Sequence, residues 1–169
     1  GGRLLIGIKD NGAVVGIRSD EEYYMLEASA QIYSKPEVKF ETNILKYEGK
    51  TVLEVWVPES SKKPHFVRNA DGTERAYIRI KDENILAPEV LVKVWLKKNH
   101  PKGSLVRYSK DEEALFSYLA QNDSISLSQF VTIAKTSRRF AVETLANLMI
   151  FDLLEYEYIE NKFRYYLTD

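Results

Sequence analysis

The amino-acid sequence predicts an α+β fold in two domains, which cover residues 1–100 and 104–169. Short β-rich runs and tight turns dominate the first part, whereas the second part contains three short amphipathic helices and two strand-like runs. Residues 99–103 between them combine Asn, Pro and Gly, as a linker does. Hydrophobic residues make up 44 % of the chain, so both parts have the material for a packed core.

Composition and charge exclude several classes of protein. The chain has no Cys, which excludes a disulfide framework, a thiolate metal site and a cysteine nucleophile. No run reaches the roughly 18 apolar residues of a membrane span, so we expect a soluble cytoplasmic protein without a membrane partner. The net charge is −1, and it divides into +1 for residues 1–100 and −2 for residues 101–169. Binding to nucleic acid would therefore require a local basic patch.

The first domain is expected to open with a β-hairpin. Residues 4–8 and 14–17 are two β-rich runs, and Asn11-Gly12 between them supplies the positive φ angles of a tight turn. A capping box of Ser19 and Glu22 then predicts a helix that ends near residue 33.

The remainder of the first domain alternates strands with turns. Pro88 is well placed in the first turn of a helix that ends near Lys98. The expected strands, the loop leading into one of them and this helix cover residues 38–47, 51–57, 62–67, 76–80 and 88–98.

The second domain has the element order of a winged helix-turn-helix. Ser-x-x-Glu at residues 109–112 and Ser-x-x-Gln at residues 126–129 are capping boxes that open two helices. A break at residues 135–137 leads into a third, longer helix. The strand-like runs 154–158 and 163–167 follow it, and three helices before a two-stranded ribbon is the winged-helix order.

Five basic residues lie on the two elements of such a module that touch a duplex. The third helix enters the DNA major groove, and Arg138 and Arg139 are at its start, with Lys135 in the preceding turn. Arginine presents a planar fork to guanine edges or phosphate oxygens. Lys162 and Arg164 lie near the tip of the ribbon. The sequence therefore predicts that this domain binds double-stranded DNA.

A protein-interaction function stays open beside this prediction. Basic residues in exposed turns are often only solvated, and winged helices also serve in protein contacts and in homo-oligomer formation. The acidic residues between 152 and 160 lie close to the ribbon and would repel phosphate.

Residues 1–12, 63–66 and 76–80 resemble the Schlafen/AlbA-like family of DNA-binding domains, found in bacterial predicted transcriptional regulators. The resemblance covers roughly residues 1–98 and implies a mixed α/β fold that binds nucleic acid. Where many members of this family continue with Gly, this chain has Lys81. The C-terminal domain resembles winged-helix regulators, which often have Gly where this chain has Asp152.

The family domain normally begins earlier, with a Glu-rich strand and a helix, so the resemblance implies an N-terminally truncated domain. Some relatives are RNA endonucleases, whose metal site combines two Glu of that segment with an Asp matching Asp10. One carboxylate cannot hold a catalytic metal, and an Asp beside Asn11-Gly12 is usually a turn residue. We therefore expect no catalytic residue and no metal site, and keep the remnant of an RNA-processing nuclease as an alternative.

The first domain offers a second basic cluster and a histidine. Lys62, Lys63 and Arg68 surround the Lys-Pro-His loop, with Arg79 on a later strand, and the resemblance makes these four a second candidate nucleic-acid surface. His65 as a general base would need an adjacent nucleophile, and the serines near it are too unspecific to nominate.

No cofactor is expected, because the chain lacks the glycine-rich loop that cradles a triphosphate. The sequence thus favours a DNA-binding transcriptional regulator over an enzyme.

Overall fold

The computed structural model describes residues 1–98 and 109–168, and its contacts divide into two units, residues 1–85 and 86–169. The N-terminal unit contains one described helix and the C-terminal unit several, and each has β-structure, so the α+β class predicted from the sequence is confirmed. The expected linker at residues 99–103 lies outside the described residues. Among the described helices, none has the length and apolar character needed to cross a membrane.

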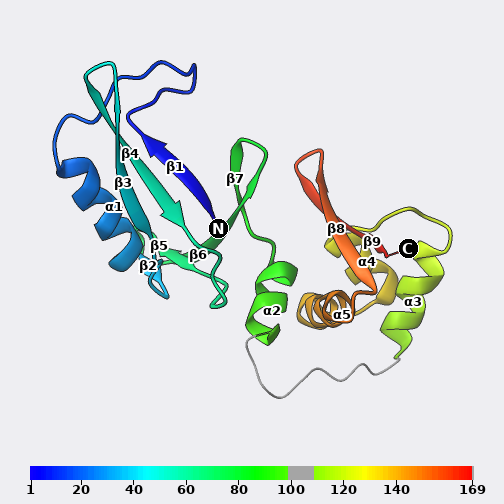
Figure 1. Cartoon of the computed structure of the whole chain (residues 1–169). Helices are drawn as coiled ribbons and strands as arrows, with labels where there is room; N and C mark the ends of the chain where they lie inside the picture. The colour runs from blue at the N-terminus through cyan, green and yellow to red at the C-terminus, as the bar shows by residue number, and fades with distance from the viewer. Residues whose placement is uncertain (99–108, 169) are drawn as a thin grey trace. The chain divides into compact units, whose positions relative to one another are not determined.

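The N-terminal unit contains a three-stranded antiparallel sheet, ordered β1-β4-β3 (Figure 1). The strands are β1 (Gly2–Ile6), β3 (Glu41–Tyr47) and β4 (Lys50–Val57). A two-residue turn joins β3 to β4, with φ angles of 46° at Glu48 and 75° at Gly49. Both positive angles belong to the turn type whose twist matches that of the flanking strands.

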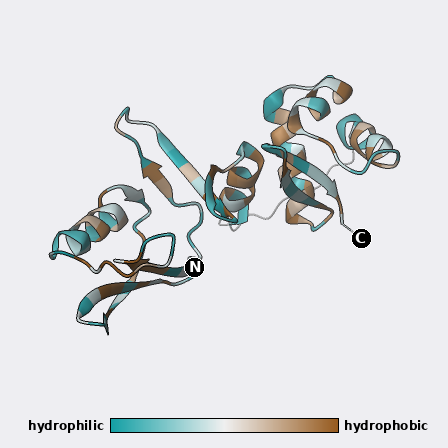
Figure 2. Cartoon of the chain, turned by 90° about the horizontal axis from the view of Figure 1, so that it is seen from above, coloured by the Kyte–Doolittle hydropathy of each residue, from teal (hydrophilic) through white to brown (hydrophobic). Residues whose placement is uncertain are grey.

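A second sheet in this unit has the order β2-β5-β6-β7. Its strands are β2 (Ser34–Lys35), β5 (Phe66–Arg68), β6 (Glu74–Ile80) and β7 (Glu83–Leu86). The sequence did not predict β7. Lys81, which stands where the resembling family has Gly, has a φ of 52° between β6 and β7, so the lysine adopts the left-handed conformation itself. Figure 2 shows hydrophobic residues along the strands of this unit.

The predicted N-terminal hairpin forms only in part. Its turn is present, because the Gly12 N–H donates to the Lys9 carbonyl at 2.8 Å. Beyond the turn, Ile8 and Val14 make a single isolated bridge, and residues 15–18 are not a strand. The chain turns away because the Gly7 carbonyl accepts the N–H groups of both Val15 and Gly16, at 2.8 and 2.9 Å. The β1 strand pairs with β4 instead.

Helix α1 (Glu21–Gln31) begins and ends inside the predicted range. The Ser19 N–H donates to the Glu22 carboxylate at 3.3 Å, and the Ser19 hydroxyl accepts from the Glu21 N–H at 3.2 Å. Asp20 occupies the position before the helix but forms no capping hydrogen bond through its side chain. The helix stops two residues before Tyr33. Ala30 is its one buried residue, so α1 gains little from packing.

The C-terminal unit contains four described helices followed by a two-stranded antiparallel ribbon (Figure 1). These elements are α2 (Glu89–Lys98), α3 (Lys110–Leu119), α4 (Leu127–Ala134), α5 (Arg138–Ile150), β8 (Leu154–Ile159) and β9 (Lys162–Leu167). Both predicted capping boxes are confirmed, with Ser109 and Ser126 each bonded reciprocally to the third helical residue. An isolated bridge between Ile125 and Tyr165 ties the segment before α4 to β9.

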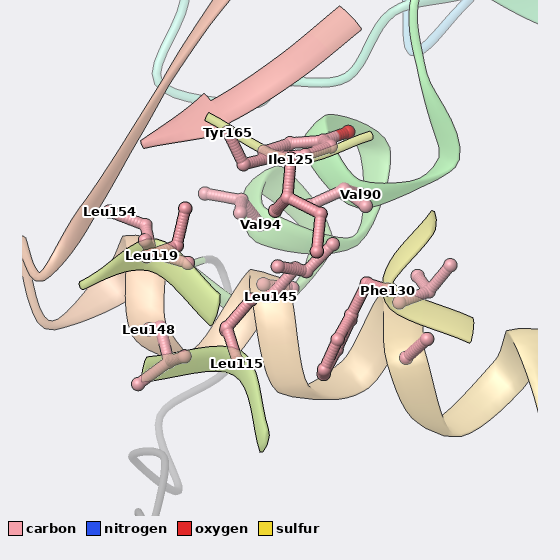
Figure 3. Packing of buried hydrophobic residues seen from close by; sticks show 13 residues of the cluster. Val90, Val94, Leu115, Leu119, Ile125, Phe130, Leu145, Leu148, Leu154 and Tyr165 are labelled. Atoms are coloured by element: carbon pink, nitrogen blue, oxygen red, sulfur yellow. The ribbon is translucent and has the colours of Figure 1, made fainter. Parts of the chain in front are cut away.

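One hydrophobic cluster holds the C-terminal unit together (Figure 3). Phe130, Tyr165 and Leu145 are essentially inaccessible to solvent within it. Val90 and Val94 of α2 belong to the same cluster, at 0 % and 4 % exposure. The sequence had grouped α2 with the first domain, but these two valines place it in the core of the second unit.

The end of α5 explains how Asp152 replaces the glycine of resembling regulators. Asp152 has a φ of 55°, the left-handed conformation that glycine adopts most easily. The Leu153 N–H donates to the Leu148 carbonyl at 2.9 Å and the Asp152 N–H to the Met149 carbonyl at 3.2 Å. These two bonds form the terminating motif that usually has glycine at this position. The geometry is therefore retained with Asp.

Candidate nucleic-acid interface

The turn between α4 and α5 determines where the predicted basic residues of the third helix lie. Lys135 has a φ of 51° and ends α4, and the Thr136 N–H behind it donates to the Val131 carbonyl at 3.3 Å. The Ser137 hydroxyl then caps α5 by accepting from the Phe140 N–H at 3.3 Å. Lys135 and the first two residues of α5, Arg138 and Arg139, are all exposed as a result.

Arg138 is bound to a carboxylate of α2. Its Nη2 and Nε donate to Glu89 Oε1 at 2.9 and 3.0 Å, while both side chains remain 58 % exposed. The hydrogen bond that Arg138 donates to Glu89 raises the pKa of Arg138 above its ordinary value. One edge of the guanidinium is thus occupied, so Arg138 must release Glu89 before that edge can bind another anion. Arg138 is therefore less available to a duplex than the sequence predicted.

Arg139 and Lys135 remain open to solvent. Across residues 1–98 and 109–168, neither of them forms a salt bridge. Phe140, next to Arg139, is 63 % exposed on the same helix. The sequence analysis did not single out Phe140. The sequence did contain a signal for it, because Phe140 is a large apolar residue that lies outside the buried apolar stripe of Ala141, Leu145 and Leu148.

Helix α2 lies beside α5 and contributes two lysines to its surface (Figure 1). Lys93 Nζ lies 2.9 Å from Glu143 Oε2, and Lys97 also pairs with Glu143. Lys97 in addition donates to Asn147 Oδ1 at 2.6 Å. The paired residues follow the same order along α2 and α5, from Glu89 with Arg138 to Lys97 with Asn147. The two helices therefore run in the same direction.

Glu143 does not cancel the positive charge of this surface. Burial raises the pKa of Glu143, but hydrogen bonds from Lys97 and Lys93 outweigh it and hold the pKa below its ordinary value. The carboxylate is therefore ionised at neutral pH, and two ammonium groups against one carboxylate leave a net charge of +1. The sequence analysis missed both lysines. The four-residue spacing of Glu89, Lys93 and Lys97 was the available signal.

The exposed Arg139 begins a row of residues on α5 that continues through the partly buried Glu143 and Asn147. Arg139, Glu143 and Asn147 are four residues apart and therefore share one side of the helix. We call the surface formed by Lys135, Arg139, Lys93 and Lys97 the basic face.

The ribbon presents one of its two predicted basic residues freely. Lys162 is exposed and follows a tight turn in which Glu160 and Asn161 have φ angles of 50° and 60°. Arg164 is half-buried, and its Nη1 donates to the Ser124 hydroxyl at 3.1 Å. The register places Glu157 directly opposite Arg164. Arg164 thus has a structural role, whereas Lys162 is available at the tip.

The four basic residues predicted in the first domain do not gather at one site. Lys62 and Lys63 line one pocket, and Lys63 Nζ lies 2.8 Å from Glu59 Oε1. Arg68 lines a different pocket and lies 3.9 Å from Glu74. The fourth, Arg79, lies 3.9 Å from Asp82 and donates to Asn84 at 3.2 Å, near the end of β6. Three of these four residues therefore lie next to a carboxylate, namely Lys63, Arg68 and Arg79.

The pocket beside Lys62 brings His65 together with one of the serines near it in the sequence. It has a volume of about 670 Å³ and is lined by Ser60 and His65. His65 Nε2 lies 2.6 Å from Ser60 Oγ, and its Nδ1 lies 2.8 Å from the Pro36 carbonyl oxygen. Of the serines near His65 that the sequence was too unspecific to nominate, Ser60 is the one whose hydroxyl lies next to the ring.

Asp10, the carboxylate that matched the metal site of nuclease relatives, is exposed in the turn after β1. Among the described residues, no three acidic or histidine side chains come close enough together to form a metal site.

Comparison with known proteins identified one family. A family model described as Schlafen, AlbA_2 matches residues 1–88, the part of the chain before α2. Neither a curated protein nor a solved structure gave a significant match.

Proposed function

Because the chain belongs to the Schlafen, AlbA_2 family, which is associated with nucleic-acid binding, we propose that it is a DNA-binding transcriptional regulator. The proposal assigns the C-terminal unit as a winged helix-turn-helix, in which α5 enters the major groove and β8 and β9 form the wing. Three helices, a bridge between Ile125 and Tyr165, and a terminal ribbon support that assignment.

The observation that carries the proposal is the exposure of Arg139 at the start of α5 and of Lys135 in the turn before it. In a winged helix this is the end of the recognition helix that reaches the bases. Lys93 and Lys97 border the same helix, with a net charge of +1 after Glu143 is counted. Lys162 at the ribbon tip is suited to a flanking phosphate.

Arg138 has a secondary role in this proposal, because Glu89 competes with DNA for its guanidinium. The contribution of Arg138 depends on breaking an exposed ion pair, which stabilises proteins by no more than about 1 kcal/mol. DNA phosphates can therefore displace Glu89 at small cost.

A titration of duplex DNA at fixed salt tests the proposal. Replacing Arg139 by Ala should weaken binding by about 1–3 kcal/mol if it contacts a base, and Lys135→Ala should lower the salt dependence by about one phosphate contact. Lys110→Ala, which removes an exposed lysine of α3 outside the basic face, is the matched control. If both test variants bind DNA as tightly as the wild type, α5 is not the helix that recognises DNA.

The variant Glu89→Gln tests, in the same titration, whether Glu89 limits the contribution of Arg138 to DNA binding. The substitution releases Arg138 without removing it, so DNA binding should tighten by about 1 kcal/mol. In the double variant Glu89→Gln, Arg138→Ala, this gain should disappear. A gain that persists would show that Glu89 acts through general repulsion of phosphate rather than by holding Arg138.

Self-association is the second candidate function, favoured by Phe140 at 63 % exposure on the open side of α5. Large apolar side chains on an exposed helix often belong to an interface. A solution mass measurement distinguishes the two functions. A dimer that Phe140→Ser converts to a monomer, together with DNA binding that Arg139→Ala leaves unchanged, would favour association over groove reading.

A further inference from the structure

The pocket in the N-terminal unit holds Ser60 and His65 in a defined orientation. The Pro36 carbonyl oxygen can only accept a hydrogen bond, so in the neutral imidazole the Nδ1 at 2.8 Å carries the proton. The lone pair of Nε2 is then directed at Ser60 Oγ, 2.6 Å away, and the hydroxyl donates to it. A ring whose one nitrogen is fixed by an acceptor while the other accepts from serine has the geometry of a nucleophile–base pair.

A second hydrogen bond prepares the serine oxygen for negative charge. The Lys62 backbone N–H donates to Ser60 Oγ at 3.0 Å. Such a donor stabilises the oxygen as its proton leaves. Ser60 is therefore flanked by a base that removes its proton and by a donor that supports the resulting charge.

The space beside this pair suits a small molecule. A volume of about 670 Å³ is within the roughly 300–1,000 Å³ of small-molecule sites. Ser60 and His65 are both partly exposed, so the pair is accessible from the pocket.

We propose that Ser60 is a nucleophile and His65 its general base, in a site that hydrolyses small carboxylic esters. Ser60 Oγ bonds to the ester carbonyl carbon while its proton passes to His65 Nε2. The bond from carbon to the leaving oxygen then breaks, and the departing alcohol takes that proton. Water attacks the acylated serine, gives a proton to Nε2, and the acid leaves as Ser60 recovers its hydrogen.

This inference is independent of the proposed DNA binding, since all of its groups belong to the N-terminal unit. In the role we assign, the Pro36 carbonyl is a positioning group that fixes the tautomer of His65.

The test uses the full chain with a fluorophosphonate probe and with p-nitrophenyl acetate. In probe labelling, Ser60 Oγ bonds to phosphorus, fluoride leaves, and the proton passes to His65. We expect a single adduct that mass spectrometry locates on Ser60, and ester hydrolysis that Ser60→Ala abolishes. Ser128→Ala is the matched control, because Ser128 is an exposed serine of α4 outside this pocket and should keep wild-type rates.

Variants of His65 separate catalysis from loop structure. His65→Asn retains a nitrogen that can donate to the Pro36 carbonyl but has no base near Ser60, so labelling should slow by roughly 10²–10⁴-fold. His65→Gln instead retains an amide near Ser60 and should be equally slow if the base is what matters. Far-UV circular dichroism verifies that each variant folds.

Three results would overturn the assignment. They are no labelling of the wild type above that of Ser60→Ala, an adduct on another residue, and wild-type labelling rates in a folded His65 variant.

Discussion

The two units of the chain bury their hydrophobic residues to different degrees. In the C-terminal unit, side chains from every helix and both strands meet in one cluster with Phe130 and Tyr165 fully enclosed. In the N-terminal unit, burial is concentrated on Val52, Leu53 and Val55 of β4. Large residues elsewhere in that unit remain open, among them Met25 at 70 % exposure. Side-chain packing thus dominates the stability of one unit, and backbone pairing contributes more in the other.

Removing the ring of Phe130 should give the largest effect. Phe130→Ala is expected to destabilise the C-terminal unit by about 3–5 kcal/mol, because it leaves a cavity in a fully buried cluster. Denaturant unfolding followed by Trp fluorescence and circular dichroism measures the change. Phe140→Ala is the control, since that ring is 63 % exposed and its loss should cost less than about 0.5 kcal/mol.

The corresponding change in the N-terminal unit should cost less. Leu53 is 3 % exposed on the central strand of its sheet, and Leu53→Ala is expected to destabilise that unit by about 2–3 kcal/mol, the low end for such substitutions. Hydrogen exchange resolved by residue measures each unit separately. A loss as large as that of Phe130→Ala would contradict the difference in packing.

Removing a helix-capping serine should also destabilise the C-terminal unit more than the N-terminal unit, by smaller amounts than removing a core side chain. Ser126 bonds reciprocally with Gln129 at the start of α4, so Ser126→Ala should cost about 1 kcal/mol. At the start of α1, the exposed Ser19 hydroxyl accepts only the Glu21 N–H, at 3.2 Å, and the helix it opens has one buried residue. We expect Ser19→Ala to cost only a few tenths of that amount in thermal unfolding measurements. Equal losses would mean that Ser19 is the effective cap.

The smallest expected effect is the loss of stability at acidic pH that comes from Glu143. Because the pKa of Glu143 in the folded chain is below its ordinary value of 4.5, its pairing with Lys97 and Lys93 stabilises the folded state above that pH. The contribution is lost as pH falls below about 4.5 through the lowered value. The melting temperature of wild type should therefore drop more between pH 6 and pH 3 than that of Glu143→Gln. Parallel decreases would show that the pairing contributes nothing.

Local sequence signals predicted the helices of the C-terminal unit well. The capping boxes at Ser109 and Ser126 formed as expected, because a box requires only residues within one helical turn. The turn at Gly12 and the ribbon turn near Asn161 are local features of the same kind, and both are present.

Features that depend on distant partners were not predictable. Residues 14–17 have the composition of a strand, yet β1 pairs with β4, and no local signal distinguishes these alternatives. Arg138 meets Glu89, which is 49 positions away along the chain, so its occupied guanidinium edge was invisible in the sequence. Ser60 and His65 are close in sequence, but the carbonyl that holds the other side of the His65 ring belongs to Pro36, 29 positions away.

The placement of α2 has a practical consequence for dissecting the chain. The family match ends at residue 88, immediately before α2 begins, whereas the linker suggested by composition follows α2. A fragment starting at residue 104 would lack Val90 and Val94, two buried members of the cluster that also contains Tyr165 and Ile125. A fragment starting at residue 86 would keep both valines. Limited proteolysis that spares α2 would identify this second boundary as the natural point of separation.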